Sequence, residues 1–436
     1  MTPAEALAEL RAAGPAPSLP ERRAALLALR RVMLARAEAV AAAAAADYGG
    51  RDPVDTLLAD VLLVADAARF AARRLRRWAR PRRAAVPLPF WPARAWSEPV
   101  PKGVIGIMAP WNYPFQLSLG VAVDAVAAGN RVVLKPSEAT PACAALVADI
   151  VAEAWPGLAR VVQGGPEVAA AFAAAPWDHL VFTGGTETGR KVMAAAAPHL
   201  TPLTLELGGK CPAIVLPGAD LGRAARDILA AKAVNAGQTC IAPDTVLLVG
   251  HPAAAFARAA RAAGLGGLGT RVVNAAQQAR LDRLAGDAAR EEAGGIALLP
   301  AAGALAEEEI FGPLLALAEC ADLPAALAWI NARPAPLAIS LHGATRAEEA
   351  AVAAGTVSGA LVSGRALEHA AMPGLPFGGV GASGFGRRGG EAGFAEFSHW
   401  RARVRHGPWS LSRLLDPPRG AFAHRLARRL VGLPPE

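Results

Sequence analysis

Between residues 103 and 198 the chain repeats one pattern four times: a short apolar run followed by a longer alanine-rich stretch. Short apolar runs that end at Gly, Pro or polar residues predict buried strands, and apolar residues at helical spacing predict helices. Strands that alternate with helices pair in parallel. The sequence therefore predicts an α/β fold, with a ligand site where polar residues follow the strands. The expected strands are residues 103–110, 131–138, 159–165 and 178–185.

The flanking regions predict further parts of the molecule. Residues 1–80 have apolar residues at helical spacing, and a second α/β unit is expected from residue 201 to about 390. The proline-rich stretch 80–103 predicts a connector or an edge strand, because proline cannot donate a hydrogen bond to a sheet. Residues 394–409 predict an outlying strand. The basic tail, residues 413–436, predicts a surface or dimer-contact helix rather than a membrane anchor.

Composition narrows the class of protein. A chain of 436 residues predicts two or three domains. The start of the chain lacks the pattern of a signal peptide, and the longest apolar stretch, residues 39–46, is too short to span a bilayer. We therefore expect a cytoplasmic protein without membrane association. The net charge of +8 could attract a polyanion, but the arginines alternate with alanines along expected helices, so nucleic-acid binding is not expected.

The four cysteines are scattered, and the chain contains neither a CxxC pair nor an HExxH motif. A disulfide framework and a metal site are therefore not expected.

Two of the strand ends carry groups suited to a dinucleotide. Gly184, Gly185 and Thr186 open an expected helix, whose first backbone N–H groups can face a pyrophosphate. The alternative is an ordinary glycine-rich turn. Lys135 and Glu138 follow another strand, where an ammonium and a carboxylate can hydrogen-bond a ribose diol. The alternative is a surface ion pair. A carboxylate there repels a 2′-phosphate, which favours NAD over NADP.

Two further residues are candidates for catalysis. Glu206 ends an apolar run before two glycines, where desolvation should raise its pKa toward that of a general base. Cys240 follows Gly237, Gln238 and Thr239, so a substrate can approach it, and nearby N–H groups would stabilise its thiolate. A buried carboxyl group and a buried apolar cysteine are the alternatives. His369 is the one histidine we consider as a base for a Cys–His hydrolase.

Seven stretches together resemble the aldehyde dehydrogenase superfamily. They occur in its order along most of residues 20–405, and they are "PWNYPF", "KPSE", "FTGGTETG", "LELGGK", "NAGQTC", "EEIFGP" and "LPFGGVGASGFG". The stretches "NAGQTCIAPD" and "NARPAPLAISL" are similar to the class 3 branch. The segment "RRLRRWARPRRAAVPLPFWPARA" resembles bacterial coniferyl aldehyde dehydrogenases.

The resemblance implies a reaction. The Cys240 thiolate would attack an aldehyde, aromatic such as coniferyl aldehyde or of medium chain length. The Asn112 amide and the Cys240 N–H would hold the oxyanion. Hydride transfer to NAD, or to NADP, would leave a thioester, which water activated by Glu206 would hydrolyse. A non-catalytic nucleotide-binding relative and a thiol esterase remain as alternatives. The residues implied around the aldehyde are Tyr113, Thr239, Ile241 and His369.

The resemblance also implies a fold: a Rossmann-type parallel-sheet NAD domain, an α/β catalytic domain and a small bridging segment that paired subunits exchange in a homodimer. The expected boundaries are 1–80 and 102–205 for the NAD domain, 206–392 for the catalytic domain, 81–101 and 393–412 for the bridging segment, and 413–436 for the tail. The residues implied around the cofactor are Pro110, Trp111, Lys135, Glu138, Phe182, Gly184, Gly185, Thr186, Leu207, Gly208, Glu309 and Phe311.

The chain departs from the family pattern in four places. Gly185 stands where the family usually has Ser, which removes one hydroxyl contact to the pyrophosphate. "GFGRRGGEAGF" replaces "GMGxYHGxxGF", which is expected to loosen that loop. "LVSGRALEHA" lacks the Asn-Asp upstream of His369. The stretch between Cys240 and Glu309 is short and shows no "PT" strand segment, which predicts that part of the catalytic sheet is missing.

Overall fold

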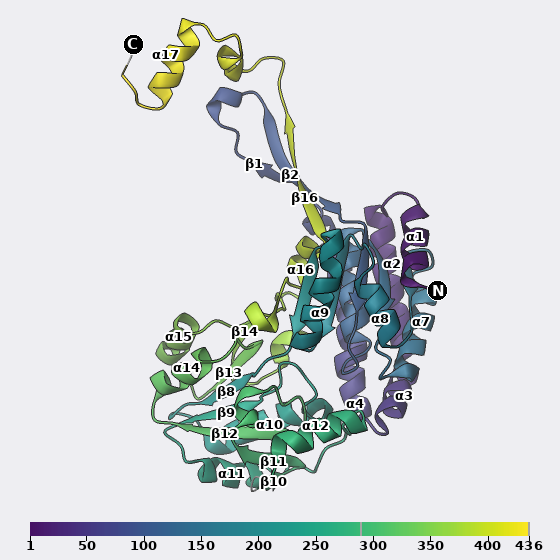
Figure 1. Ribbon diagram of the computed structural model, residues 1–436, viewed down its shortest axis with the longest axis vertical. Coiled ribbons are helices and arrows are strands. Elements are labelled where there is room, and N and C mark those ends of the chain that lie inside the picture. Colours follow the sequence, from purple (N-terminus) through teal and green to yellow (C-terminus); the bar gives the residue numbers. More distant parts are fainter. Residues whose placement is uncertain (288–289, 435–436) are drawn as a thin grey trace.

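The computed structural model describes residues 1–287 and 290–434; residues 288–289 of the short stretch and residues 435–436 of the tail lie outside the described residues. Three sheets organise the chain (Figure 1). Two are large and covered by helices, and the third is a narrow arm that projects away from them. The predicted α/β fold is confirmed.

The first large sheet has six strands in the order β15-β7-β6-β3-β4-β5. Five of them are parallel, as predicted, and β15 runs antiparallel to β7. Neighbouring residues of β3 face opposite layers of helices, because side chains alternate along a strand. The strands are β3 (Val104–Met108), β4 (Arg131–Lys135), β5 (Ala159–Val161), β6 (His179–Gly184), β7 (Leu203–Leu207) and β15 (Gly384–Phe385).

Two groups of helices bury the faces of this sheet. One face packs against a core that also draws on the N-terminal helices and on two crossover helices: α2 (Leu19–Ala35), α3 (Ala37–Tyr48), α5 (Leu63–Trp78), α6 (Val121–Ala128) and α7 (Pro141–Ala154). The other face packs against α1 (Pro3–Ala12), α8 (Pro166–Ala173) and α9 (Thr186–Ala196). The prediction of helices over residues 1–80 is confirmed, with α4 (Pro53–Thr56) and a π-helical turn, Leu57–Leu62, between α3 and α5.

The second large sheet has seven strands in the order β10-β11-β12-β9-β8-β13-β14, all parallel except β10. The strands are β8 (Pro212–Val215), β9 (Thr245–Val249), β10 (Glu291–Ala293), β11 (Ile296–Pro300), β12 (Leu314–Cys320), β13 (Ala338–His342) and β14 (Ala360–Ser363). The helices of this unit are α10 (Leu221–Ala233), α11 (Ala253–Ala262), α12 (Ala275–Ala285), α13 (Ala304–Glu307), α14 (Leu323–Asn331) and α15 (Arg346–Gly355).

The prediction that part of this sheet is missing is wrong. The apolar run "IALLP", which precedes Glu309 in the chain, forms β11. This strand pairs in parallel with β12. Its side chains are buried because β11 is covered on both faces, one toward α10 and α11 and the other toward α12. The stretch between Cys240 and Glu309 is short, but it still contains the strand that leads to Glu309.

The third sheet is the arm seen in Figure 1, with the order β1-β2-β16. Its strands are β1 (Arg82–Ala84), β2 (Arg94–Pro101) and β16 (Ser398–Arg405), and both pairings are antiparallel. Helix α16 (Gly390–Glu396) leads into β16, and α17 (Ala421–Leu430) lies beyond the far end of the arm. The predicted outlying strand is confirmed. No helix among the described residues is long and apolar enough to cross a membrane.

Candidate active site

Residues from both large sheets meet beside Cys240. The carboxyl ends of β3, β4, β6 and β7 share one edge of the six-stranded sheet, because these strands are parallel neighbours. Cys240 follows α10 and a short turn, Val234–Gly237. It lines a cavity of about 380 Å³. The other lining side chains are mostly apolar, and they include Leu58, Leu62, Leu63, Leu117, Val234, Ile241, Leu367 and Phe377, with Tyr113, Gln116, Thr239, Glu368 and Arg388 as polar members.

Side-chain amides shape the turn that presents Cys240. Asn235 and Ala236 have φ values of 51° and 52°, a left-handed conformation that costs free energy for residues with a Cβ atom. The Asn235 amide donates to the Asn112 carbonyl at 3.0 Å, and the Gln238 amide donates to the carbonyls of Asn235 and Arg271. These bonds compensate for the unfavourable backbone conformation. The residue types in "NAGQTC" therefore have a structural role around the thiol.

Asn112 reaches the Cys240 loop from the end of β3. Its side-chain N–H donates to the Gln238 carbonyl at 3.1 Å, and its buried Oδ1 has no hydrogen-bond partner among the described residues. Next to it, the Tyr113 hydroxyl lies 2.6 Å from the hydroxyl of Thr239. Tyr113, Thr239 and Ile241, which the resemblance places beside the aldehyde, all line the cavity of Cys240.

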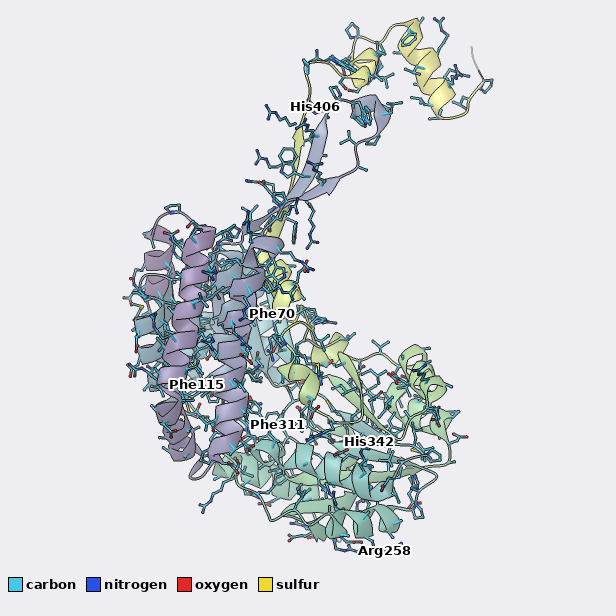
Figure 2. The ribbon with its side chains drawn as sticks, turned by 180° about the vertical axis from the view of Figure 1, so that it is seen from behind. Phe70, Phe115, Arg258, Phe311, His342 and His406 are labelled. Carbon is cyan, nitrogen blue, oxygen red and sulfur yellow. The ribbon has the colours of Figure 1, made fainter. Side chains whose placement is uncertain are left out.

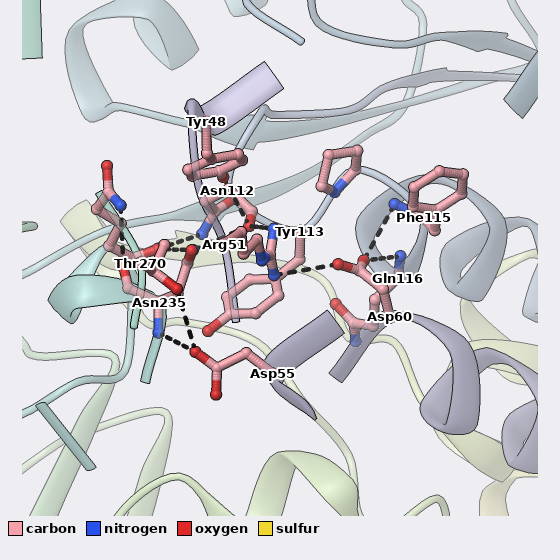
Figure 3. Close-up of polar contacts among 12 residues, drawn as sticks. Tyr48, Arg51, Asp55, Asp60, Asn112, Tyr113, Phe115, Gln116, Asn235 and Thr270 are labelled. Carbon is pink, nitrogen blue, oxygen red and sulfur yellow. Dashed lines mark hydrogen bonds and ion pairs between the residues drawn. The ribbon is translucent and has the colours of Figure 1, made fainter. Parts of the chain in front are cut away.

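A buried ion pair supports this loop from behind (Figure 3). Arg51 and Asp60 pair at 3.2 Å with fully buried side chains, and Arg51 also donates to the Asn112 carbonyl at 3.1 Å. Asp60 accepts hydrogen bonds from the backbone N–H groups of Phe115 and Gln116. Because both charges are satisfied only when the loop 111–116 is in place, the pair ties the loop to the N-terminal helices. Sequence reasoning missed these residues.

Glu206 lies at the end of β7 and forms an ion pair that sequence reasoning also missed. The Arg388 Nε lies 2.7 Å from Glu206 Oε1 and donates a hydrogen bond to Oε2 at 2.8 Å. Burial raises the pKa of Glu206, and the charge of Arg388 opposes that rise. The predicted direction of the pKa shift is confirmed. The available signal was "GFGRRGG", where two arginines interrupt a glycine-rich loop.

The Cys240 thiol has a different environment from the one expected. Burial raises its pKa to about 12, and the negative charges of Glu309 and Glu206 contribute to the rise. Arg388 and a backbone hydrogen bond act in the opposite direction but are outweighed. The expected stabilisation of the thiolate by nearby N–H groups is therefore exceeded by desolvation in the free protein. The thiol therefore stays protonated in the free protein unless a neighbouring group changes its charge or accepts the proton.

Aromatic rings meet where the nicotinamide is expected. The rings of Trp111 and Phe311 contact edge to face, with centroids 5.4 Å apart, and both residues are half-buried. Figure 2 shows Phe311 between the helical layer and the second large sheet, which is where Glu309 also arrives after β11 and α13. Burial raises the pKa of Glu309 to about 7. The side chains of both sheets therefore converge on one region, which includes Pro110 at the end of β3.

The strand ends that we assigned to the adenosine half have suitable groups. The buried Lys135 donates to Glu138 at 2.6 Å. Burial alone would raise the pKa of Glu138, but hydrogen bonds from Lys135 and from its own backbone lower it overall, so the carboxylate stays ionised. Helix α9 begins at Thr186, and Gly185 before it provides no side-chain cap. Its first N–H groups are therefore open to a phosphate, as NAD(P) requires.

Phe182, Leu207 and Gly208, which were also expected around the cofactor, have close contacts with their neighbours. The Phe182 ring lies so near Gly184 that a Cβ atom there would clash with it at 2.5 Å. The Leu207 side chain packs on α9, where a Cβ atom on Gly189 would approach it to 2.8 Å. A side chain at Gly208 would collide with the Glu309 carboxylate. Side chains at Gly184 and Gly208 are therefore excluded by their neighbours.

His369 lies apart from the proposed aldehyde site. It is in a turn, Glu368–Ala371, and stacks on Phe377 with ring centroids 6.1 Å apart. It does not line the cavity of Cys240, although its neighbours do. Burial lowers its pKa, and Arg388 adds to this effect. Neither ring nitrogen has a hydrogen-bond partner among the described residues. We find no His/Cys/Asp/Glu cluster in the described part of the chain that could hold a metal ion.

Comparison with known proteins supports this arrangement. The model of the aldehyde dehydrogenase family matches residues 5–264 and 296–402. A probable coniferyl aldehyde dehydrogenase of Pseudomonas aeruginosa is 38% identical, over 96% of this chain and 93% of that protein. The coniferyl aldehyde dehydrogenase of a Pseudomonas species is 37% identical, over 92% and 89%. The substrate-bound structure of Staphylococcus aureus AldH covers 95% of both chains, with a TM-score of 0.88 and 29% identity. The chain therefore belongs to the aldehyde dehydrogenase family and is an oxidoreductase that acts on aldehydes with NAD(P).

Proposed function

We propose that this enzyme oxidises an aromatic aldehyde, such as coniferyl aldehyde, to its carboxylic acid with Cys240 as nucleophile, Asn112 as oxyanion donor and Glu206 as base. One observation carries the proposal: Cys240 lines a mostly apolar cavity, with the charge of Glu206 acting on that thiol and the Asn112 amide bonded into its loop. An apolar cavity with a few polar groups at its end suits an aromatic ring that carries an aldehyde. Two relatives with this substrate in their names support the choice.

The chain's own groups then have defined tasks. The Cys240 thiolate adds to the aldehyde carbon, and the Asn112 amide and the Cys240 N–H stabilise the oxyanion. NAD, when bound, supplies the hydride acceptor. Glu206 accepts a proton from the water that attacks the thioester carbonyl, the carbon–sulfur bond breaks, and the thiolate of Cys240 is regenerated with release of the acid. Lys135 and Glu138 would hold the adenosine ribose, and Trp111 and Phe311 the nicotinamide.

We propose a preference for NAD over NADP, because the ionised Glu138 stands where a 2′-phosphate would lie. We also propose a homodimer in which each arm lies on the other subunit. The position of the protein in the cytoplasm remains an expectation from the sequence.

The direct test is absorbance of NADH during incubation of the protein with NAD and either coniferyl aldehyde or octanal. We expect NADH formation, with a higher kcat/KM for coniferyl aldehyde. Cys240→Ala should abolish it, whereas Cys320→Ala, a change of a buried cysteine in β12, should leave it in place. Absence of NADH with a broad panel of aldehydes would instead support a non-catalytic relative.

A further inference from the structure

Arg388 reaches Glu206 from a part of the chain that is remote in sequence. Strand β15 places Gly384 opposite Glu206, and four residues later the Arg388 side chain returns to the same carboxylate. The side chains of Arg388 and Glu206 are 10% and 3% exposed. In the class 3 pattern a Tyr stands at this position, so the ion pair is a departure of this chain from that pattern.

The Arg388 side chain is held in place by Phe377. The two residues exchange backbone hydrogen bonds, each 2.8 Å long, and the guanidinium carbon lies 4.2 Å from the centre of the Phe377 ring. This cation–π contact fixes the plane of the guanidinium and covers one of its faces. Arg388 also lines the cavity that contains Cys240. The expectation that the altered loop is loose is not supported at this position.

Arg388 contacts both carboxylate oxygens of Glu206 through the same nitrogen. Oε2 accepts the hydrogen bond from Arg388, and the buried Oε1 lies 2.7 Å from the same Nε without a hydrogen bond of good geometry among the described residues. A buried carboxyl group without a counter-charge is protonated at neutral pH and cannot act as a base. A guanidinium at 2.7 Å favours the ionised form. Arg388 therefore favours the carboxylate form of Glu206 against the rise in pKa that burial causes, and it fixes the orientation of the carboxylate.

We propose that Arg388 is a positioning residue for acid release, which favours the carboxylate form of Glu206 and orients it beside Cys240, so that Oε1 can take a proton from water. In that step water attacks the thioester carbonyl, its proton moves to Oε1, and the carbon–sulfur bond breaks to return the thiolate of Cys240. The inference rests on the proposed role of Glu206 in the proposed function. Arg388 would then set the pH range in which the thioester is hydrolysed.

Three other titratable groups face this pair. Burial raises the pKa of Asp124 to about 7, and its carboxylate accepts the N–H of Gly389 at 2.7 Å. Above pH 7 Asp124 is therefore a second anion that shares the charge of Arg388. His369 is kept neutral by burial and by Arg388, so it does not compete for Glu206. Cys240 is the third group, and Arg388 favours its thiolate.

The test uses hydrolysis of p-nitrophenyl acetate, which forms an acetyl thioester on Cys240 with release of nitrophenolate and needs no cofactor. A burst of nitrophenolate reports acetylation, and the slower steady phase reports hydrolysis of the thioester. In Arg388→Met we expect a burst of one nitrophenolate per chain and then hydrolysis that is about tenfold slower or more at pH 7. The apparent pKa of the hydrolysis step should rise by about one to three units, because a counter-charge is lost.

Two variants of the same loop provide the comparison. Arg388→Lys keeps the charge, so its apparent pKa should stay near that of the wild type while the rate falls, because an ammonium cannot reproduce the position of Nε. Arg387→Met is the matched control, since the hydrogen bonds of Arg387 to the described residues go only to the backbone carbonyls of Gly379 and Gly386. It should change neither phase.

The proposal is overturned if Arg388→Met leaves the apparent pKa of hydrolysis unchanged, or if it slows acetylation and hydrolysis equally. If this variant is insoluble, an altered pKa in soluble Arg388→Lys would contradict the proposal by itself. If the wild type oxidises no aldehyde but shows the expected burst and slower hydrolysis with p-nitrophenyl acetate, the proposed function is contradicted and the role of Arg388 is not.

Discussion

At the scale of single residues, the charged side chains around Cys240 control when it can react. Two carboxylates, Glu309 and Glu206, raise the pKa of the thiol in addition to burial, and one guanidinium lowers it. The pKa of Glu309 is itself raised to about 7, so its charge appears only above that pH. Reactivity of the thiol in the free protein therefore depends on the ionisation of Glu309 as well as on that of Cys240 itself.

Replacing Glu309 by Gln should accelerate alkylation of Cys240. The variant removes a negative charge that raises the pKa of the thiol, so more thiolate is present at a given pH. The acceleration should appear above pH 7 and vanish below it, where Glu309 is already protonated. Mass spectrometry after timed iodoacetamide treatment between pH 6 and about pH 10 measures the rate.

Glu308→Gln is the matched control for that experiment. Glu308 is the neighbouring residue, but it is exposed and paired with Arg283 at 2.6 Å. It should leave the alkylation profile unchanged. Equal effects of the two variants would contradict the specific role of Glu309.

Glu138 is expected to determine the choice of cofactor. Its carboxylate is ionised and bonded to Lys135, so it can accept from a ribose diol but repels a phosphate. Glu138→Gln should lower kcat/KM with NAD and raise it with NADP, which reverses or narrows the preference. The measurement is kcat/KM for both cofactors at low ionic strength, where charge repulsion is least screened. A constant ratio would contradict this role.

At the scale of elements, the Arg51–Asp60 pair links the N-terminal helices to the loop after β3. Breaking a fully buried pair from one side leaves an uncompensated charge, which costs about 3–5 kcal/mol. Arg51→Met should therefore lower the free energy of unfolding by that amount in a denaturant titration. It should also lower kcat, because Arg51 holds the carbonyl of Asn112.

The surface pair of Arg36 and Glu153 provides the control. Its side chains are 37% and 48% exposed, and exposed pairs contribute about 0–1 kcal/mol. Arg36→Met should have little effect on unfolding or on kcat. If Arg51→Met were equally harmless, the pair would not stabilise the loop.

The elements themselves could be predicted from the sequence where local pattern and environment agree. The strands of the six-stranded sheet are apolar runs between breakers, and β3, β4 and β6 begin within one residue of the predicted start. Strand β11 was missed because "IALLP" is short and lies in a stretch rich in alanine and glycine, and only its position between two covered faces makes it a strand. Local sequence does not contain that information.

The same limit applies to the site. Glu206 and Cys240 were predicted because each is a candidate from its local residues and each stands in one of seven stretches that together resemble the family. Arg388 was not, because its partner is 182 residues away in the chain, and no local pattern records that distance. Asp124 had a signal that went unused: it is a lone acid in the apolar helix "GVAVDAVAAGN". A charge inside an apolar helix indicates a buried partner.

At the scale of the whole molecule, the arm has a strand edge and apolar side chains that no part of the same chain covers in the described structure. Strand β16 forms one edge of the three-stranded sheet, and β14 forms one edge of the seven-stranded sheet. Such edges carry unpaired backbone groups that favour pairing with another chain. The arm also exposes large apolar side chains, among them Leu88, Trp91, Val404 and Trp409. A homodimer related by a two-fold axis would cover these groups twice, once on each subunit.

The proposed dimer can be tested by light scattering after size-exclusion chromatography. The wild type should have the mass of two chains at micromolar concentration, and Val404→Asp should have the mass of one, because it puts a charge on the strand that is to be covered. Val54→Asp is the matched control: Val54 and Val404 are both 58% exposed, but Val54 lies in α4, outside the arm and outside the seven-stranded sheet. It should remain dimeric. A wild type with the mass of one chain, or a loss of the dimer in both variants, would contradict assembly through the arm. Because Cys240, Glu206 and Asn112 all belong to one chain, the monomeric variant should still be acetylated at Cys240 by p-nitrophenyl acetate, which separates assembly from chemistry.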